Sequence, residues 1–184
     1  MTMHSPKHLP LHLEPRPDYL QKVMGTAIFA SDVEVPGMLH GKILRSTVPH
    51  ARIRGIDATA ALAMPGVVAI LTGEDLKNLP GSAIRWGLSL RDRPVIALEK
   101  VRYVGDPVAA VAAVDEATAE EALDSIVVDY EPLPFVTTTR EALQAGAPSV
   151  HEDMDKVKDF YFRGECAPVA GTNQFQQWNY ESGE

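Results

Sequence analysis

Three basic residues near the first quarter of the chain form its most site-like basic group: Arg45, His50 and Arg52. Cationic side chains of this kind form charge-assisted hydrogen bonds with acidic partners. Two interpretations stay open for them. They belong either to an exposed turn that joins two strands, or to a contact with a neighbouring subunit or with the acidic edge of a cofactor.

A second candidate group consists of His4, His8 and His12, which stand four residues apart. On a helix this spacing would stack the three side chains as metal ligands. The prolines between them, Pro6 and Pro10, prevent such a helix. We therefore interpret the histidines as solvated residues of an extended arm.

Other patterns that carry chemistry are absent or incomplete. The sequence contains no glycine-rich phosphate loop and no Gly-x-Ser-x-Gly, and no second histidine follows His151-Glu152 at the zinc-protease spacing. Cys166 is the only cysteine, which excludes an internal disulfide and an intramolecular cysteine-ligated cluster but leaves a reactive thiol possible in principle. Carboxylate pairs such as Asp129/Glu131 are expected on a strand end or a solvated helix face, where no acid–base role is indicated. The residues alone thus predict a core without an active site.

A Gly105-Asp106-Pro107 corner leads into an apolar run over residues 108–114. Such a corner fixes where a chain reverses and enters a core. The run itself is ambiguous, because its alanines favour helix while its valines and its length favour strand.

The elements that must position these groups follow from periodicity and capping. We expect strands over 39–45, 51–56, 67–72 (buried) and 126–131, and a loop over 73–93. A brief helix should begin at an Asp57 N-cap and run through Met64, where Pro65-Gly66 ends it. A longer helix should follow an Asp115 N-cap, with Ala119, Ala122, Leu123 and Ile126 as its apolar stripe, and Thr138 with Glu141 should form the capping box of a last short helix. The mixture lacks a regular βαβ repeat, which predicts the α+β class.

Composition and charge argue against a nucleic-acid-binding or membrane-spanning role. The 184 residues are 45% hydrophobic and 23% charged, as in an ordinary globular protein, and the net charge is −8. Because no cluster of Lys and Arg interrupts this acidity, we expect no local basic patch and no nucleic-acid partner. The apolar runs are far shorter than the about 20 residues that span a bilayer, so no membrane segment is expected. No secretory signal is recognisable, which predicts a cytoplasmic location.

Three regions are expected: an extended N-terminal arm over 1–20, a dense domain over 21–150, and an irregular, aromatic-rich connector over 151–184. An aromatic-rich segment without a helical or strand periodicity usually packs onto another part of the structure, such as another chain. The aromatic residues of this connector are Phe160, Tyr161, Phe162, Phe175, Trp178 and Tyr180.

Four segments, taken in order, resemble the N-terminal α/β hammerhead domain of the molybdopterin-binding subunit in the xanthine dehydrogenase and aldehyde oxidase family. They are Pro36-Gly-Met-Leu-His-Gly-Lys-Ile-Leu-Arg45, His50-Ala-Arg-Ile53, Val101–Val114 and Val128-Asp-Tyr-Glu-Pro-Leu-Pro134. Asp106 stands where the family commonly has Glu or Gln. The resemblance implies a hammerhead-like domain with a mixed sheet and a few short helices, and it makes residues 108–114 a strand.

The family's members are molybdenum hydroxylases, which insert a water-derived oxygen into an aldehyde or N-heterocycle. The resemblance implies that this chain binds no cofactor itself. Molybdopterin, 2Fe–2S clusters and FAD are expected in partner chains: a molybdopterin-binding chain or domain, an iron–sulfur subunit and, as in most members of the family, a flavin subunit. The chain stops where the next domain should begin, so it is either a natural split subunit or a fragment.

The sequence therefore predicts no catalytic residue in this chain. Contacts to other domains are expected instead, and their candidates are Arg45, His50, Arg52, Gly105, Asp106, Pro107, Phe160, Phe162, Phe175, Trp178 and Tyr180. Two alternatives remain: a stand-alone interaction or scaffold module without redox activity, and an independent hydrolase, which is weak because no nucleophile–base pair can be named.

Overall fold

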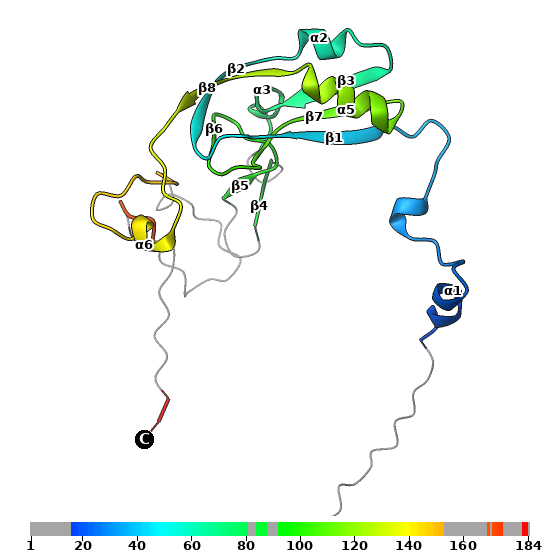
Figure 1. Ribbon diagram of the computed structural model, residues 1–184, viewed down its shortest axis with the longest axis horizontal. Helices are drawn as coiled ribbons and strands as arrows, with labels where there is room; N and C mark the ends of the chain where they lie inside the picture. Colours follow the sequence, from blue (N-terminus) through cyan, green and yellow to red (C-terminus); the bar gives the residue numbers. More distant parts are fainter. Residues whose placement is uncertain are drawn as a thin grey trace, which may run out of the picture. The chain divides into compact units, whose positions relative to one another are not determined.

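A computed structural model of the chain describes residues 16–80, 84–87, 92–152, 169, 171–174 and 182–183 (Figure 1). The chain divides into two compact units, Met1–Met38 and Leu39–Glu184.

In the first unit the described residues contain two short helices, α1 (Tyr19–Val23) and the 3-10 helix η1 (Ala30–Asp32). The expectation of extended chain up to residue 20 is wrong for Tyr19 and Leu20, which lie in α1. No proline interrupts α1, since the next proline after Pro17 is Pro36, and an ion pair from Asp18 to Lys22 spans the helix turn. The three histidines of the arm lie outside the described residues.

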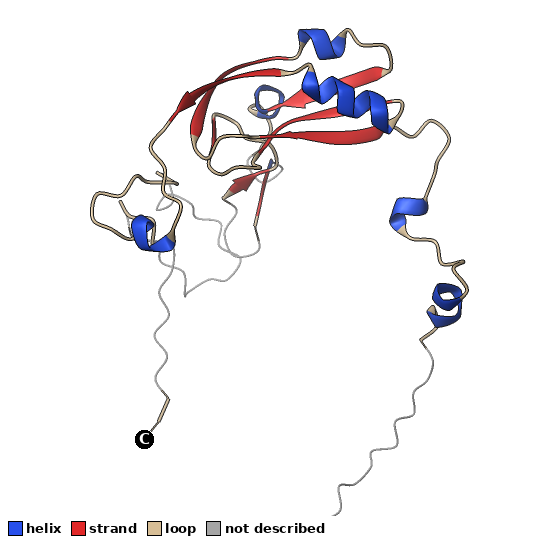
Figure 2. Cartoon of the chain, in the orientation of Figure 1, coloured by secondary structure: helices blue, strands red, loops and turns tan. Residues whose placement is uncertain are grey.

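The second unit contains the sheets. Its elements, in chain order, are β1 (His40–Arg45), β2 (Ala51–Asp57), α2 (Thr59–Leu62), β3 (Val67–Thr72), α3 (Gly73–Leu76), β4 (Arg85–Trp86), β5 (Arg93–Pro94), β6 (Lys100–Val101), β7 (Pro107–Ala113), α5 (Glu116–Asp124), β8 (Val127–Pro132) and α6 (Thr139–Ala142). Figure 2 shows short helices set against longer strands in this unit. The α+β class is confirmed.

The described strands pair in the orders β1-β7-β3, β6-β2-β8 and β4-β5, and each pairing is antiparallel. Strand β7 is therefore the middle strand of its sheet. Its residues Val108, Ala109, Val111 and Ala113 are at most 2% exposed. The ambiguous run is thus a strand, as the resemblance implied, because hydrogen bonding on both edges and burial override the helix preference of its alanines.

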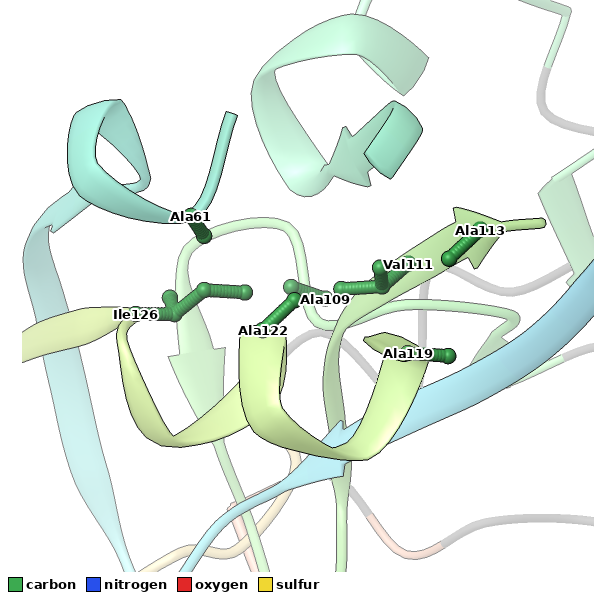
Figure 3. Packing of buried hydrophobic residues seen from close by; sticks show 7 residues of the cluster. All are labelled: Ala61, Ala109, Val111, Ala113, Ala119, Ala122 and Ile126. Carbon is green, nitrogen blue, oxygen red and sulfur yellow. The ribbon is translucent and has the colours of Figure 1, made fainter. Parts of the chain in front are cut away.

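One core lies between β7 and the helices α2 and α5. Figure 3 shows its side chains pointing toward one another: Ala61, Ala109, Val111, Ala113, Ala119, Ala122 and Ile126. Helix α5 begins as predicted, with the Asp115 carboxylate accepting a hydrogen bond from the Thr118 backbone N–H at 2.7 Å. The small alanine side chains on both sides allow this helix to pack closely on the sheet.

Several expectations about local structure need correction. Strand β3 is present at an edge of its sheet, but it is not fully buried, because Val68 and Leu71 are 55% and 39% exposed. The Asp57 carboxylate accepts a hydrogen bond from the Thr59 backbone N–H at 3.0 Å, yet α2 has Ala58 as its N-cap residue and already ends at Leu62.

The expected loop over 73–93 is wrong, because it contains α3, β4 and β5. The signal for α3 is in the sequence: the Asp75 carboxylate accepts a hydrogen bond from the Thr72 backbone N–H at 2.7 Å, a capping box of the Thr-x-x-Asp type.

Replacing Gly73 by alanine should destabilise the domain. A Cβ at this position would lie 2.3 Å from the Ala97 carbonyl oxygen, which belongs to the backbone and cannot turn away. We expect the Gly73→Ala variant to lose about 2 kcal/mol in the free energy of unfolding measured by urea denaturation.

The matched control is Gly55→Ala, because a Cβ on Gly55 would meet no heavy atom within 4 Å. This variant should change the free energy of unfolding by less than about 0.5 kcal/mol. Equal effects of the two substitutions would contradict the tight contact between α3 and residue 97.

Candidate functional site

The turn between β1 and β2 is joined to the Gly105-Asp106-Pro107 corner by backbone hydrogen bonds. The Ser46 N–H donates to the Asp106 carbonyl at 2.8 Å, and the Gly105 N–H donates to the Ser46 carbonyl at 2.8 Å. Gly105 has a φ of +94°, which favours glycine over residues with a Cβ. The corner therefore has a structural role, because it sets the register at which the chain enters β7.

Arg45 joins this corner, since its guanidinium Nη1 donates to the Gly105 carbonyl at 3.0 Å. Pro107 takes part through its carbonyl, which accepts from the Ala97 N–H at 2.7 Å. The structure thus brings Arg45 to the consecutive residues Gly105, Asp106 and Pro107, although it lies 60 residues before Gly105 in the sequence.

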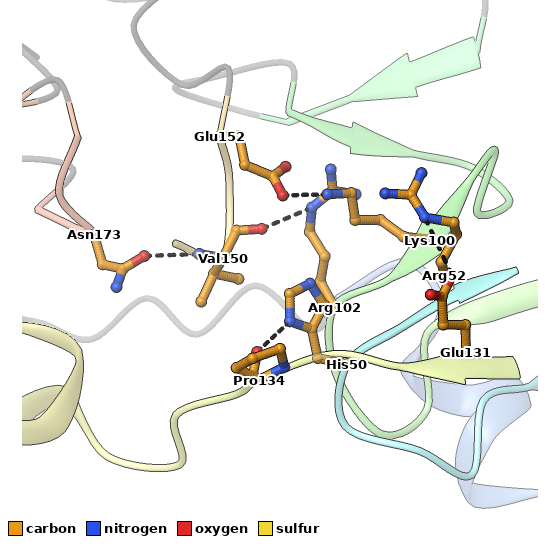
Figure 4. Close-up of polar contacts among 9 residues, drawn as sticks. All are labelled: His50, Arg52, Lys100, Arg102, Glu131, Pro134, Val150, Glu152 and Asn173. Carbon is orange, nitrogen blue, oxygen red and sulfur yellow. Dashed lines mark hydrogen bonds and ion pairs between the residues drawn. The ribbon is translucent and has the colours of Figure 1, made fainter. Parts of the chain in front are cut away.

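His50 is only 6% exposed, which corrects the expectation of an exposed turn. Its ring Nδ1 lies 2.7 Å from the Pro134 carbonyl oxygen, a contact drawn in Figure 4. Because a carbonyl oxygen can only accept, Nδ1 carries the proton. Among the described residues the buried Nε2 has no hydrogen-bond partner. Packing between β2 and the end of β8 accounts for this burial, since the Leu133 N–H also bonds the His50 carbonyl.

Arg52 differs from His50 in being 54% exposed at its side chain. Its Nε lies 3.6 Å from the Glu131 carboxylate on the neighbouring strand β8, and Arg54 reaches the same carboxylate at 3.1 Å. Exposed pairs of this kind contribute little to stability. Arg52 is therefore available for a contact outside the domain.

A hollow of about 320 Å³ opens beside the corner, and we call it the acid–base hollow. Burial raises the pKa of the Asp106 carboxyl above its ordinary value, although the Arg102 backbone N–H donates to this carboxylate at 2.9 Å. Burial also raises the pKa of the Tyr103 phenol and lowers the pKa of the His151 imidazole. The lining consists of Asp92, Arg93, Pro94, Arg102, Tyr103, Asp106 and His151.

A second hollow of about 470 Å³ shares Pro94 and Arg102 with the first. We call it the basic hollow, because five cationic side chains of the described residues line it: Arg52, Lys77, Arg85, Lys100 and Arg102. Two carboxylates, Glu99 and Glu152, belong to the same lining. The expectation that no local basic patch exists is therefore wrong. These cations come from separate segments between residues 52 and 102, so no run of Lys and Arg in the sequence indicates them.

The chain that leaves the domain is fixed next to both hollows. Arg102 Nε donates to the Val150 carbonyl at 3.0 Å, and Lys100 forms an ion pair with Glu152 (Figure 4). The Asn173 side chain accepts from the Val150 N–H at 2.8 Å and donates to the Pro148 and Ala142 carbonyls at 2.9 and 3.1 Å. Sequence reasoning missed Lys100, Arg102 and Asn173, whose partners are distant in the chain.

The aromatic candidates of the connector, Phe160, Phe162, Phe175, Trp178 and Tyr180, lie outside the described residues, as do Tyr161 and Cys166. Within the described ranges no group of three or more His, Cys, Asp or Glu side chains is gathered to hold a metal ion. No helix in the described part of the chain is long and apolar enough to cross a membrane.

Comparison with known proteins shows the family of this chain. The family "Aldehyde oxidase and xanthine dehydrogenase, a/b hammerhead domain" matches residues 24–134, more than half of the chain. The chain belongs to this family. The hammerhead match includes the β1–β2 turn, the corner at Gly105 and most of the lining of both hollows.

Relatives of the hammerhead chain are the molybdenum-carrying subunits of larger enzymes. This chain is 44% identical over 136 residues to the nicotinate dehydrogenase large molybdopterin subunit of Eubacterium barkeri, and the aligned region covers 74% of this chain and 31% of the relative. It is 36% identical over 149 residues to the xanthine dehydrogenase molybdenum-binding subunit of Escherichia coli, covering 78% of this chain and 20% of the relative. The chain thus spans less than a third of the length of either relative.

Solved structures agree with the sequence comparison. The chain superposes on CO dehydrogenase from Oligotropha carboxidovorans with a TM-score of 0.69 and 35% identity, covering 80% of this chain and 19% of that chain. For the aldehyde oxidoreductase from Desulfovibrio gigas the TM-score is 0.64 at 35% identity, with 74% and 16% covered. The hammerhead fold is therefore shown by sequence and by structure.

The His151 imidazole should titrate below the ordinary histidine pKa of about 6.5. Its burial disfavours the imidazolium, and the nearby Arg102 acts in the same direction, while Asp92, 3.9 Å from Nε2, opposes them. A pKa lowered in the folded state means that this group costs stability as the pH falls from above 6.5 through the folded-state pKa. Titration of the ring protons by NMR measures the shift directly.

A His151→Gln variant provides the second readout. Its melting temperature should fall less than that of the unmodified chain between pH 7 and pH 5. An NMR pKa for His151 at or above the ordinary value would contradict the burial of this ring.

Proposed function

We propose that this chain is the hammerhead portion of the molybdopterin-binding subunit of a molybdenum hydroxylase complex. The complex hydroxylates an aldehyde or an N-heterocycle with an oxygen derived from water. In this assignment the chain comprises an N-terminal arm over 1–20, the hammerhead domain over 21–150 and a connector over 151–184. Its role is structural and assembly-related, and it takes no chemical step itself.

One observation carries the proposal: the relatives are molybdenum-carrying subunits of such enzymes, and the hammerhead match covers the domain's described core. The arrangement of the polar residues supports an assembly role. Ser46, His50 and Asp106 are buried, and their side chains bond backbone groups of Val48, Pro134 and Arg102, which is the pattern of a folded scaffold. Arg52, Arg85 and Trp86 are exposed on the surface, where another domain can reach them.

The partners follow from the same assignment. Molybdopterin is held by a following domain or chain, the 2Fe–2S clusters by an iron–sulfur subunit, and FAD by a flavin subunit. Because the residues that line the substrate are expected in other domains, the proposal names the reaction class and not the substrate.

Affinity purification of the tagged chain from its native cells tests the proposal. We expect larger partner chains to be recovered by mass spectrometry together with molybdenum and iron by elemental analysis. A monomer recovered without partners and without either metal would contradict the proposal and favour a stand-alone scaffold.

Replacing Arg52 by alanine should separate assembly from folding. Because this side chain is exposed and its distance to the Glu131 carboxylate is 3.6 Å, the melting temperature of the isolated chain should fall by less than about 3 °C. Recovery of the partner chains should decrease several-fold in the same variant. A large loss of melting temperature with unchanged recovery would return Arg52 to a purely structural role.

A further inference from the structure

We propose that the basic hollow and the two aromatic side chains beside it, Trp86 and Tyr103, form a docking surface for a polypeptide segment that carries carboxylates and apolar side chains. The segment belongs to another domain or subunit of the assembly. The inference rests on the proposed function only for the identity of that partner, because the surface itself is defined by this chain.

Charge is the first argument. In a chain of net charge −8, five cations and two carboxylates line this one hollow. Three of the cations already face carboxylates of the chain: Arg52 lies near Glu131, Lys77 pairs with Glu74, and Lys100 pairs with Glu152. A locally cationic surface on an acidic protein selects an acidic partner segment.

Arg85 and Arg102 are the cations that such a partner would meet. Arg85 Nη1 donates to the Asp92 carbonyl at 3.2 Å, and Arg102 Nε donates to the Val150 carbonyl at 3.0 Å. A neutral carbonyl holds a guanidinium in position without cancelling its charge. Each guanidinium has five N–H donors in a planar fork, so further donors can bind a carboxylate.

The aromatic residues give the second, independent argument. Trp86 is 56% exposed and Tyr103 is 49% exposed, and the Arg93 guanidinium carbon lies 5.6 Å from the centroid of the Trp86 ring. Tyr103 and Arg93 line the acid–base hollow, which shares Pro94 and Arg102 with the basic hollow. Trp86 itself lines neither hollow, and it is linked to the surface through Arg93. Exposed Trp, Tyr and Arg are the residue types that dominate binding energy at protein interfaces.

These two features together favour a polypeptide over a small anion. A free phosphate would use the guanidinium groups and gain nothing from an indole ring. A segment that alternates acidic and apolar side chains satisfies Arg85 and Arg102 and also covers Trp86. Glu152 provides a precedent within the chain, because its carboxylate already occupies one side of the hollow against Lys100.

Calorimetric titration of the purified chain with a synthetic peptide tests the inference without any partner subunit. The probe is an acetylated peptide of three Glu-Leu-Glu repeats, and its matched control has glutamine in place of each glutamate. We expect the glutamate peptide to bind and the glutamine peptide to bind at least about tenfold more weakly. Raising the salt concentration should weaken the binding of the glutamate peptide.

Two variants locate the binding. Arg85→Gln and Trp86→Ala should each weaken the glutamate peptide by about tenfold. Arg54→Gln is the matched control, because Arg54 is 59% exposed and pairs with Glu131 but does not line the hollow. Its affinity should stay within about twofold of the unmodified chain. Circular dichroism checks that each variant keeps its fold.

Three results would overturn the inference. The first is no binding of the glutamate peptide, and the second is equal binding of both peptides. The third is binding of inorganic pyrophosphate as tight as that of the peptide together with no effect of Trp86→Ala, which would make the hollow a site for small anions. Because none of these measurements requires a partner chain, their failure is distinct from failure to recover the molybdenum complex.

Discussion

The strand β7 is the constraint on which the rest of the domain depends. Val108 belongs to one core cluster, Ala109, Val111 and Ala113 belong to a second, and Ala110 packs against a third. A strand that is hydrogen-bonded on both edges and packed on both faces must carry apolar side chains on both faces, and small or β-branched ones pack there readily. Its sequence, Pro-Val-Ala-Ala-Val-Ala-Ala, meets this requirement.

The polar residues at the start of β7 follow from that constraint. The chain must reverse at Gly105 and enter the core at Pro107, and the buried Asp106 closes the corner by accepting the Arg102 N–H. The same segment places Arg102 and Tyr103 at the surface beside the hollows. The corner that the core requires therefore also presents Arg102 and Tyr103 at the surface. The same residues that fix the fold thus place the side chains proposed for assembly.

Features encoded within a few residues could be predicted from the sequence. The Asp115 cap, the Thr138–Glu141 capping box and strands β1, β2 and β8 depend on local pattern, and the structure has them. The Thr72–Asp75 box has the same local character, but a search for glutamate at the third position overlooks it. The burial of His50 depends on Pro134, and the basic hollow depends on segments spread between Arg52 and Glu152. Such features arise from tertiary contacts, and neither has a signature in the order of neighbouring residues.

We propose that this hammerhead chain assembles with its partners through the surface formed by the basic hollow, Trp86 and Tyr103. Hydrogen–deuterium exchange of the chain, alone and within the recovered complex, tests this claim. We expect slower exchange on assembly for amides of residues 85–86, 93–94 and 99–103, with little change on the exposed face of α5. Unchanged exchange in those segments, with protection elsewhere, would contradict the claim.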